Sequence, residues 1–246
     1  MNIKKHIPNL FTLGNLFCGT VATIFAVQSE FELTAIFVVI GIVFDFFDGF
    51  LARILKVSGE LGKQLDSLAD MVTSGVVPGL VMFYLFTDIQ IDVADFNDEL
   101  SIQNYLPFLG LLLTLAACYR LAKFNLDTRQ SESFIGLPTP AMSLFVISLP
   151  LIQMNTEFEL AQNLISNNYF LIGVTLFLSY LMNADLPLFS LKFKNYGVKD
   201  NMFKYLLIAL SILLLITVQY LALPIIMLVY IILSMIDNLK IRKERS

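Results

Sequence analysis

Four aspartates lie within two long apolar stretches of the chain, where charged side chains are unusual. They are Asp45, Asp48, Asp66 and Asp70. A charged side chain at the centre of a bilayer costs about 2.5–3.5 kcal/mol on insertion scales, so acids in such stretches need a partner or a function. The surrounding pattern reads D-x-x-D-G-x-x-A-R, eight further residues, then G-x-x-x-D-x-x-x-D.

Helix geometry places the two aspartates of each pair on one face. Asp45 and Asp48 are three positions apart, about 60° around a helix, and Asp66 and Asp70 are four positions apart, about 40°. The first pair falls toward the end of one predicted span and the second in the first turns of the next. An antiparallel hairpin would bring both pairs to a similar depth, so we predict that the four carboxylates converge on one cavity.

Four carboxylates so close together stay ionised only if cations bind them. Oxygen ligands without histidine or cysteine favour Mg²⁺, Mn²⁺ or Ca²⁺ over Zn²⁺. Two divalent ions held by four aspartates are typical of a site that handles phosphates. Gly49 and Ala52 leave room for a ligand or for close helix approach. Arg53 adds a planar cation suited to phosphate.

The composition indicates the elements that must position this site. Apolar residues make up 57% of the 246 residues and charged residues only 15%, and the mean hydropathy is +0.76. Because a typical soluble domain has about 25% charged residues, a soluble globular enzyme is excluded. We expect an all-α polytopic membrane protein with about eight transmembrane helices, each of ~20 residues. The predicted spans are approximately 9–28, 33–55, 66–87, 104–123, 139–154, 168–185, 202–219 and 222–238.

The basic residues predict how these spans are oriented. With eight spans, all 16 lysines and arginines fall on one side of the membrane. The charged residues of the loops on the opposite side are all acidic. Basic residues concentrate in cytoplasmic loops. We therefore predict a multi-pass protein of the cell membrane, with both termini and the aspartate site at the cytoplasmic face.

The aspartate pattern resembles the signature of the CDP-alcohol phosphatidyltransferase family and matches it at every specified position. Within that family the chain is similar to the bacterial and archaeal phosphatidylserine synthases. The similar segments are 7–15, 65–78, 120–125 and 134–140.

The resemblance implies a fold, a reaction and roles for the aspartates. The fold is a six-helix catalytic core over residues 1–190, followed over 191–246 by two more transmembrane helices and a basic tail. The reaction transfers a phosphatidyl group from CDP-diacylglycerol to L-serine and releases CMP. Two Mg²⁺ or Mn²⁺ ions bind at the four aspartates, and Asp70 is the general base. A homodimer is also implied, and we expect no nucleic-acid partner.

The resemblance further implies that Gly49, Ala52 and Arg53 contact the CDP part of the donor. On the first span, Asn9, Thr12 and Asn15 share one helix face. Polar residues there indicate either a nucleotide contact, which we expect for Asn9 and Thr12, or hydrogen bonds between helices.

The acceptor site is expected at the end of the fourth span, because serine brings a carboxylate that needs a cation. The candidates are Arg120, Lys123, Asn125 and Arg129. The three basic residues are equally explained as flanking charge on the cytoplasmic side, and Asn125 as a loop residue bonded to its own backbone. Lys123 stands where the resembling proteins commonly carry arginine.

Two other functions remain open. The same chemistry could use another alcohol, such as glycerol 3-phosphate or an inositol phosphate. From another class, a cation transporter could bind its ion at the aspartates, although Arg53 would repel a passing cation.

Overall fold

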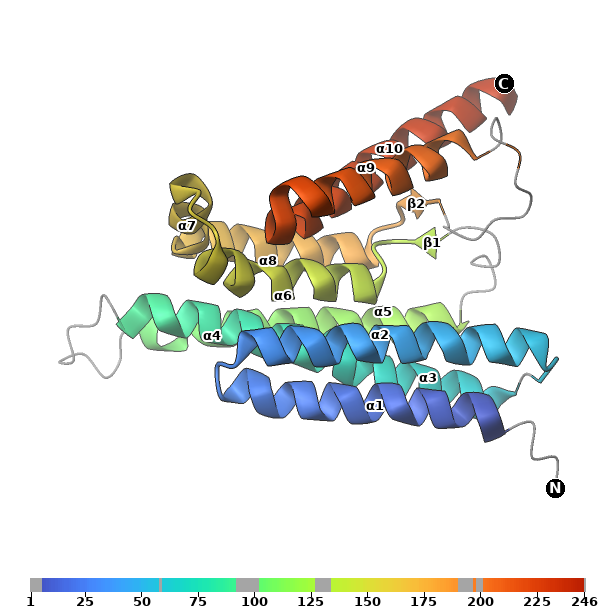
Figure 1. Ribbon diagram of the computed structural model, residues 1–246, viewed down its shortest axis with the longest axis horizontal. Coiled ribbons are helices and arrows are strands. Elements are labelled where there is room, and N and C mark those ends of the chain that lie inside the picture. The colour runs from blue at the N-terminus through green and yellow to red at the C-terminus, as the bar shows by residue number, and fades with distance from the viewer. Residues whose placement is uncertain are drawn as a thin grey trace.

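The computed structural model describes residues 6–57, 59–91, 102–126, 134–189, 197 and 201–245. Its first half consists of helices that run side by side (Figure 1). Their bounds are α1 (His6–Val27), α2 (Phe31–Ile54), α3 (Glu60–Met71), a π-helical turn η2 (Val72–Val76), α4 (Val77–Ile91), a 3₁₀ segment η3 (Ile102–Leu111) and α5 (Leu112–Leu126). Long apolar runs form helices because a membrane leaves no water to satisfy backbone polar groups.

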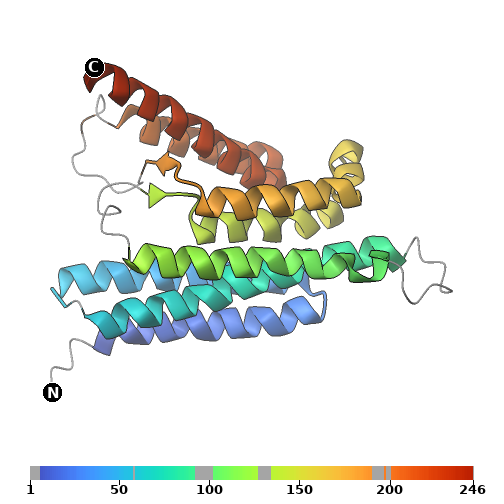
Figure 2. The same ribbon diagram turned by 180° about the vertical axis from the view of Figure 1, so that it is seen from behind.

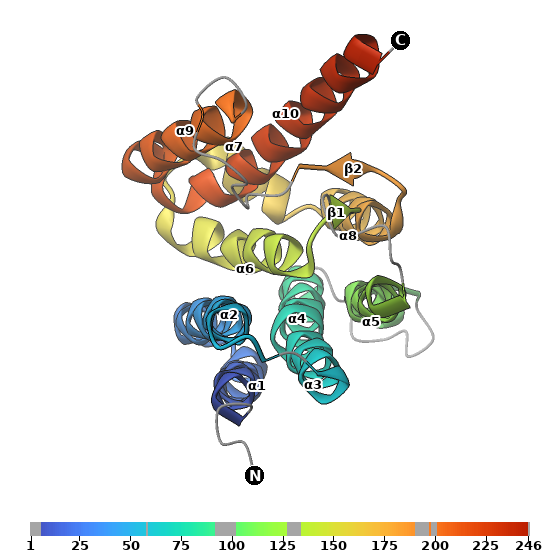
Figure 3. The same ribbon diagram turned by 90° about the vertical axis from the view of Figure 1, so that its right-hand side faces the viewer.

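The second half continues with short strands and further helices. The elements are β1 (Phe134–Ile135), α6 (Thr139–Asn155), α7 (Glu159–Ile165), α8 (Asn168–Asn183), β2 (Pro187–Leu188), α9 (Met202–Val218), a 3₁₀ turn η5 (Gln219–Leu221) and α10 (Ala222–Arg245). The strands pair antiparallel, with Phe134 opposite Leu188. Seen end-on, α1 to α5 form one group, with α2 and α4 on the side toward α6; α6 and α8 lie against this group, and α9 and α10 form the outermost pair (Figure 3). From behind, α5 runs beside α8 (Figure 2).

The hydropathy of these helices confirms an all-α multi-pass membrane protein. Five helical segments among the described residues are long and apolar enough to cross a membrane. The number rises to six if α7 and α8, bent by 74° at their junction, are taken as one span. The helix that contains Asp66 begins at Glu60, six residues before the predicted span. Its first turns are too polar for a hydropathy pattern to include them.

The helix ends that carry basic residues gather at one end of the bundle. These are the end of α2, the start of α3, the end of α5, the start of α9 and the end of α10 (Figure 1). The segregation of charge predicted from the sequence therefore appears in the fold, within the part of the chain that the structure describes.

Two glycines on neighbouring helices make room for Thr73 of the π-helical turn. A Cβ atom on Gly19 would lie 3.0 Å from the backbone N and Cα of Thr73. A Cβ on Gly41 would lie 2.9 Å from Thr73 Cγ2. Thr73 in turn donates a hydrogen bond to Asn15 Oδ1 at 2.8 Å. Single π-helical turns within α-helices are frequent at functional sites, and this turn begins two residues after Asp70.

Gly19→Ala should destabilise the protein by about 1–3 kcal/mol, because the added methyl group meets backbone atoms that cannot rotate away. Thermal unfolding in detergent measures the effect as a lower Tm. Gly173→Ala on α8 is the matched control, since a Cβ there meets no atom within 4 Å. Equal Tm values for the two variants would contradict this account of the packing.

Candidate active site

Three of the four aspartates lie together where α2 and α3 pass each other. One carboxylate oxygen each from Asp45, Asp48 and Asp66 lie within 4.8 Å of one another. α2 ends at Ile54 and α3 begins at Glu60, and the two helices run in opposite directions (Figure 1). The carboxyl groups of Asp45 and Asp66 are within hydrogen-bonding reach of each other. The two helices therefore bring together three of the four carboxylates that were predicted to converge.

This cluster fits a divalent cation. Oxygens bound to one Mg²⁺ or Ca²⁺ ion lie about 2.0–2.6 Å from it, so two of them are at most about 4–5 Å apart. Asp48 is buried, with 7% of its surface exposed. The ion pair found among the described residues joins Lys123 to Asp185, so no described lysine or arginine pairs with the three acids. Hard oxygen donors with uncompensated charge are the ligands that Mg²⁺ and Mn²⁺ prefer.

Asp70 lies one helical turn beyond Asp66, at the border of the cluster. Its Oδ1 accepts a hydrogen bond from Asn15 Nδ2 at 3.1 Å. Its carboxylate interacts electrostatically with Asp66 and also with Arg120 of α5. Asn15 is fully buried and is held on its other side by Thr73. A buried, hydrogen-bonded amide thus fixes the carboxylate of Asp70.

The polar face of α1 contacts the aspartates directly. Thr12 Oγ1 donates to Asp48 Oδ2 at 2.5 Å, and Asn9 Oδ1 lies 3.3 Å from the position that a Cβ on Gly62 would take. Thr12 and Asn15 therefore make hydrogen bonds between helices, which was one of the two interpretations of this face. Asn15 was not among the predicted site residues, although its spacing from Thr12 could have identified it.

The part of α2 that comes after Asp48 in the chain leaves open space next to the cluster. A Cβ on Gly49 would meet no atom within 4 Å. Ala52 is half-buried, and the Arg53 side chain is exposed. A ligand could approach the carboxylates along this side, because small residues there leave space and the arginine stands at its end.

The predicted acceptor residues have different surroundings. Arg120 is buried, with 6% exposed, and its Cζ lies 5.9 Å from the centre of the Phe124 ring. Lys123 Nζ lies 3.4 Å from Asp185 Oδ1. Asn125 Nδ2 donates to Ser67 Oγ at 2.8 Å, beside Asp66. Arg129 lies outside the described residues.

Arg120 and Asn125 thus lie close to the aspartates, whereas Lys123 is engaged with a carboxylate of the segment that follows α8. The Oδ1 atom of Asn125 is buried and accepts no hydrogen bond from the described part of the chain. The backbone oxygen of Asn125 accepts from Lys63 Nζ at 2.5 Å, which ties the end of α5 to α3.

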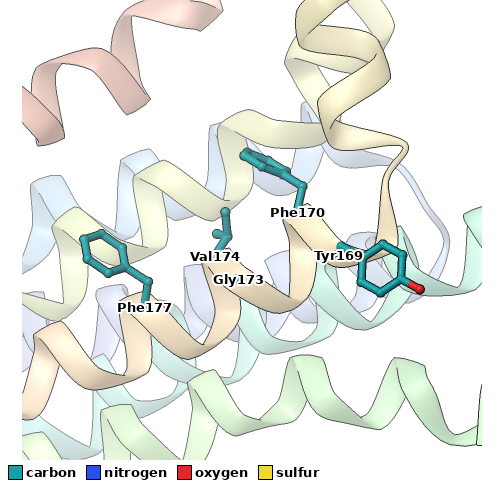
Figure 4. Close-up of a pocket in the computed structure, with 5 residues that line it drawn as sticks. All are labelled: Tyr169, Phe170, Gly173, Val174 and Phe177. Carbon is teal, nitrogen blue, oxygen red and sulfur yellow. The ribbon is translucent and has the colours of Figure 1, made fainter.

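A separate hollow of about 380 Å³ lies on α8 (Figure 4). It is lined by Tyr169, Phe170, Gly173, Val174 and Phe177. It carries no carboxylate and no basic side chain, and a bilayer-facing helix commonly presents such an apolar surface. The aspartate cluster, not this hollow, is therefore the candidate active site.

A helical membrane bundle with clustered carboxylates open on one side has the features of a metal-dependent membrane enzyme. The chain belongs to the CDP-alcohol phosphatidyltransferase family, whose model matches residues 5–181.

The chain is also similar to individual proteins whose names refer to serine or to a serine lipid. The chain is 34% identical over 150 residues to a CDP-diacylglycerol--serine O-phosphatidyltransferase of Bacillus subtilis, covering 59% of this chain and 75% of that protein. It is 28% identical over 239 residues to a protein of the same name from Helicobacter pylori, covering 93% and 89%. It is 26% identical over 182 residues to an archaetidylserine synthase of Methanothermobacter thermautotrophicus, covering 70% and 72%.

Proposed function

We propose that this protein transfers the phosphatidyl group of CDP-diacylglycerol to the hydroxyl of L-serine, forming phosphatidylserine and CMP in phospholipid biosynthesis. The observation that carries the proposal is the meeting of the Asp45, Asp48 and Asp66 carboxylates within 4.8 Å. Membership of the family supports the reaction class. The serine-specific names of relatives from two bacteria support the choice of acceptor.

Asp45, Asp48, Asp66 and Asp70 would hold two Mg²⁺ or Mn²⁺ ions, which would neutralise the diphosphate and help CMP to leave. Gly49, Ala52 and Arg53 would bind the CDP part on the open side of α2, with Asn9 and Thr12 facing it from α1. The acyl chains of the donor would stay in the bilayer.

Asp70 would act as general base. A carboxylate within hydrogen-bonding reach of the serine hydroxyl can take its proton as the oxygen attacks phosphorus. The bond from phosphorus to the CMP oxygen then breaks, and the hydrogen bond from Asn15 keeps the Asp70 carboxylate oriented. Direct transfer is expected because the chain has one histidine, His6, and two cysteines, Cys18 and Cys118, none of them in the aspartate cluster.

The acceptor would bind beside Asp70. Arg120 would face the serine carboxylate, since it is buried and interacts with Asp70. Asn125 has a buried oxygen that could accept a hydrogen bond from the ammonium group. Lys123 and Arg129 would add positive charge at the entrance. The homodimer and the division of the chain at residue 190 stay predictions.

The acceptor is tested with purified protein, CDP-diacylglycerol, Mn²⁺ or Mg²⁺, and one alcohol at a time. We expect CMP release with serine and little with glycerol 3-phosphate or an inositol phosphate. Release with one of those alcohols alone would contradict the choice of serine. No CMP with any alcohol, together with metal-ion flux into liposomes, would indicate a transporter.

Gly49→Ala should weaken donor binding without destabilising the fold. The methyl group would enter space that is open in the protein, so Tm should match that of Gly173→Ala. If CDP occupies that space, the KM for CDP-diacylglycerol should rise about tenfold, because overpacking costs about 1–3 kcal/mol. An unchanged donor KM would remove Gly49 from the CDP site.

We further propose eight membrane crossings with both termini and the active site on the cytoplasmic side. The continuous apolar segment Met202–Asn238 supports two crossings, since α9 and α10 turn back on each other at Gln219, where φ is +48°. The gathering of basic helix ends at one end of the bundle supports the orientation.

Single cysteines introduced in a background without Cys18 and Cys118 test this topology. In intact cells, Asp95→Cys should react with an impermeant maleimide, and Glu60→Cys should react only after the membrane is permeabilised. The reverse labelling pattern would show that the aspartate site faces outward.

A further inference from the structure

The side-chain amide of Asn15 has a different partner at each of its two ends. Its Nδ2 donates to Asp70 Oδ1 at 3.1 Å, and its Oδ1 accepts a hydrogen bond from Thr73 Oγ1 at 2.8 Å. An amide turned by 180° has nearly the same shape, but it would present its oxygen, an acceptor, to the carboxylate of Asp70. The hydrogen bond to Asp70 therefore requires the amide to keep one of its two orientations.

The hydroxyl of Thr73 favours this orientation. It lies 2.8 Å from Asn15 Oδ1 and 3.2 Å from the backbone oxygen of Asn15. A backbone oxygen can only accept, so a hydroxyl between these two atoms acts as a donor toward α1. The side chains of Asn15 and Thr73 are fully buried. Because buried polar atoms need a partner, the amide oxygen is held on the side of Thr73 and the amide nitrogen on the side of Asp70.

The surrounding helices confine both side chains. A Cβ on Gly41 of α2 would lie 3.0 Å from Asn15 Oδ1 and 2.9 Å from Thr73 Cγ2, so α2 packs closely against the pair. α3, which carries Asp70, continues directly into the π-helical turn that carries Thr73. One continuous helical segment thus supplies both the carboxylate and the hydroxyl that orients the amide between them.

We propose that Thr73 is a positioning residue that acts on Asp70 through Asn15. By holding Asn15 Oδ1, the hydroxyl keeps Nδ2 on the Asp70 carboxylate, and the other carboxylate oxygen stays directed toward the hydroxyl of the acceptor. A general base works only within hydrogen-bonding reach of the proton that it takes. This inference rests on the proposed function, in which Asp70 is the general base.

Thr73→Val tests the proposal, because valine keeps the branched shape and lacks the hydroxyl. We expect kcat to fall about 5- to 30-fold, the range for one lost buried hydrogen bond. The KM for CDP-diacylglycerol at saturating Mn²⁺ should stay near the wild-type value. Thr175→Val is the matched control, since Thr175 of α8 is also fully buried but donates to Leu171 O within its own helix at 2.8 Å. Its kcat should equal that of the wild type.

Thr73→Ser separates positioning from packing. It keeps the hydroxyl and removes the methyl group that lies against Gly41, so Tm should fall while kcat stays near the wild-type value. Thr73→Ala removes both groups and should lower kcat as Thr73→Val does. The pair of Ser and Ala variants isolates the hydroxyl even if valine crowds the helices and prevents folding.

A double variant tests whether the effect passes through Asp70. With Asp70→Asn in place, Thr73→Val should change kcat less than about twofold, because the carboxylate that Thr73 positions is already absent. The inference would be overturned by equal kcat values in Thr73→Ser and Thr73→Ala, or by an undiminished effect in the Asp70→Asn background. Wild-type protein that releases no CMP with serine would instead contradict the proposed function.

Discussion

Asp70→Asn is expected to reduce kcat by about 10²–10⁴-fold, the contribution typical of a general base. The asparagine keeps the size of the side chain and an oxygen that can accept the hydrogen bond from Asn15. It cannot take a proton from the serine hydroxyl. The rate of CMP release measures the loss, and calorimetry with CDP-diacylglycerol in Mn²⁺ measures donor binding, which should remain detectable.

Glu159→Gln is the matched control for this variant, because it also replaces a carboxylate by an amide. Glu159 lies exposed at the start of α7, away from the cluster. Its kcat should equal that of the wild type. Activity of Asp70→Asn within about threefold of the control would assign the general base to another group.

Asp45→Asn is expected to lower the affinity for Mn²⁺ at least about 100-fold, because even residues behind metal ligands change affinity by about 10–100-fold. The reason is the loss of one of three carboxylates that meet within 4.8 Å. Binding is measured by electron paramagnetic resonance of free Mn²⁺ or by calorimetry, with no need for turnover. CMP release should fall in parallel.

The same variant should raise the Tm of the metal-free protein. Without a cation, three carboxyl groups at this distance must either repel one another or take up a proton, and both cost free energy of folding; an asparagine at position 45 removes that cost. Proteins commonly tolerate such destabilising arrangements at functional sites. Unchanged Mn²⁺ affinity in Asp45→Asn, measured beside Glu159→Gln, would show that the cluster is not the metal site.

The aspartate cluster could be predicted from spacing because local geometry decides it. Positions three or four apart share a helix face whatever the rest of the fold does. Asp45 and Asp48 therefore had to face one way, and the short connection to α3 brought Asp66 opposite them. The same reasoning identified the polar face of α1, where Thr12 was found to contact Asp48.

Contacts that depend on packing could not be predicted in this way. Thr73, in the π-helical turn, packs against Gly19 and Gly41, which belong to two other helices. Hydropathy also marks apolar segments only, so it did not include the polar first turns of α3 or the short helix α7.

The most direct measurement is mass spectrometry of the lipid formed when purified protein is supplied with CDP-diacylglycerol, Mn²⁺ and isotope-labelled serine. We predict labelled phosphatidylserine and CMP in equal amounts, both abolished by a chelator and by Asp45→Asn. CMP without labelled lipid, or labelled lipid formed equally well by Asp45→Asn, would contradict the assignment of serine transfer to the aspartate cluster.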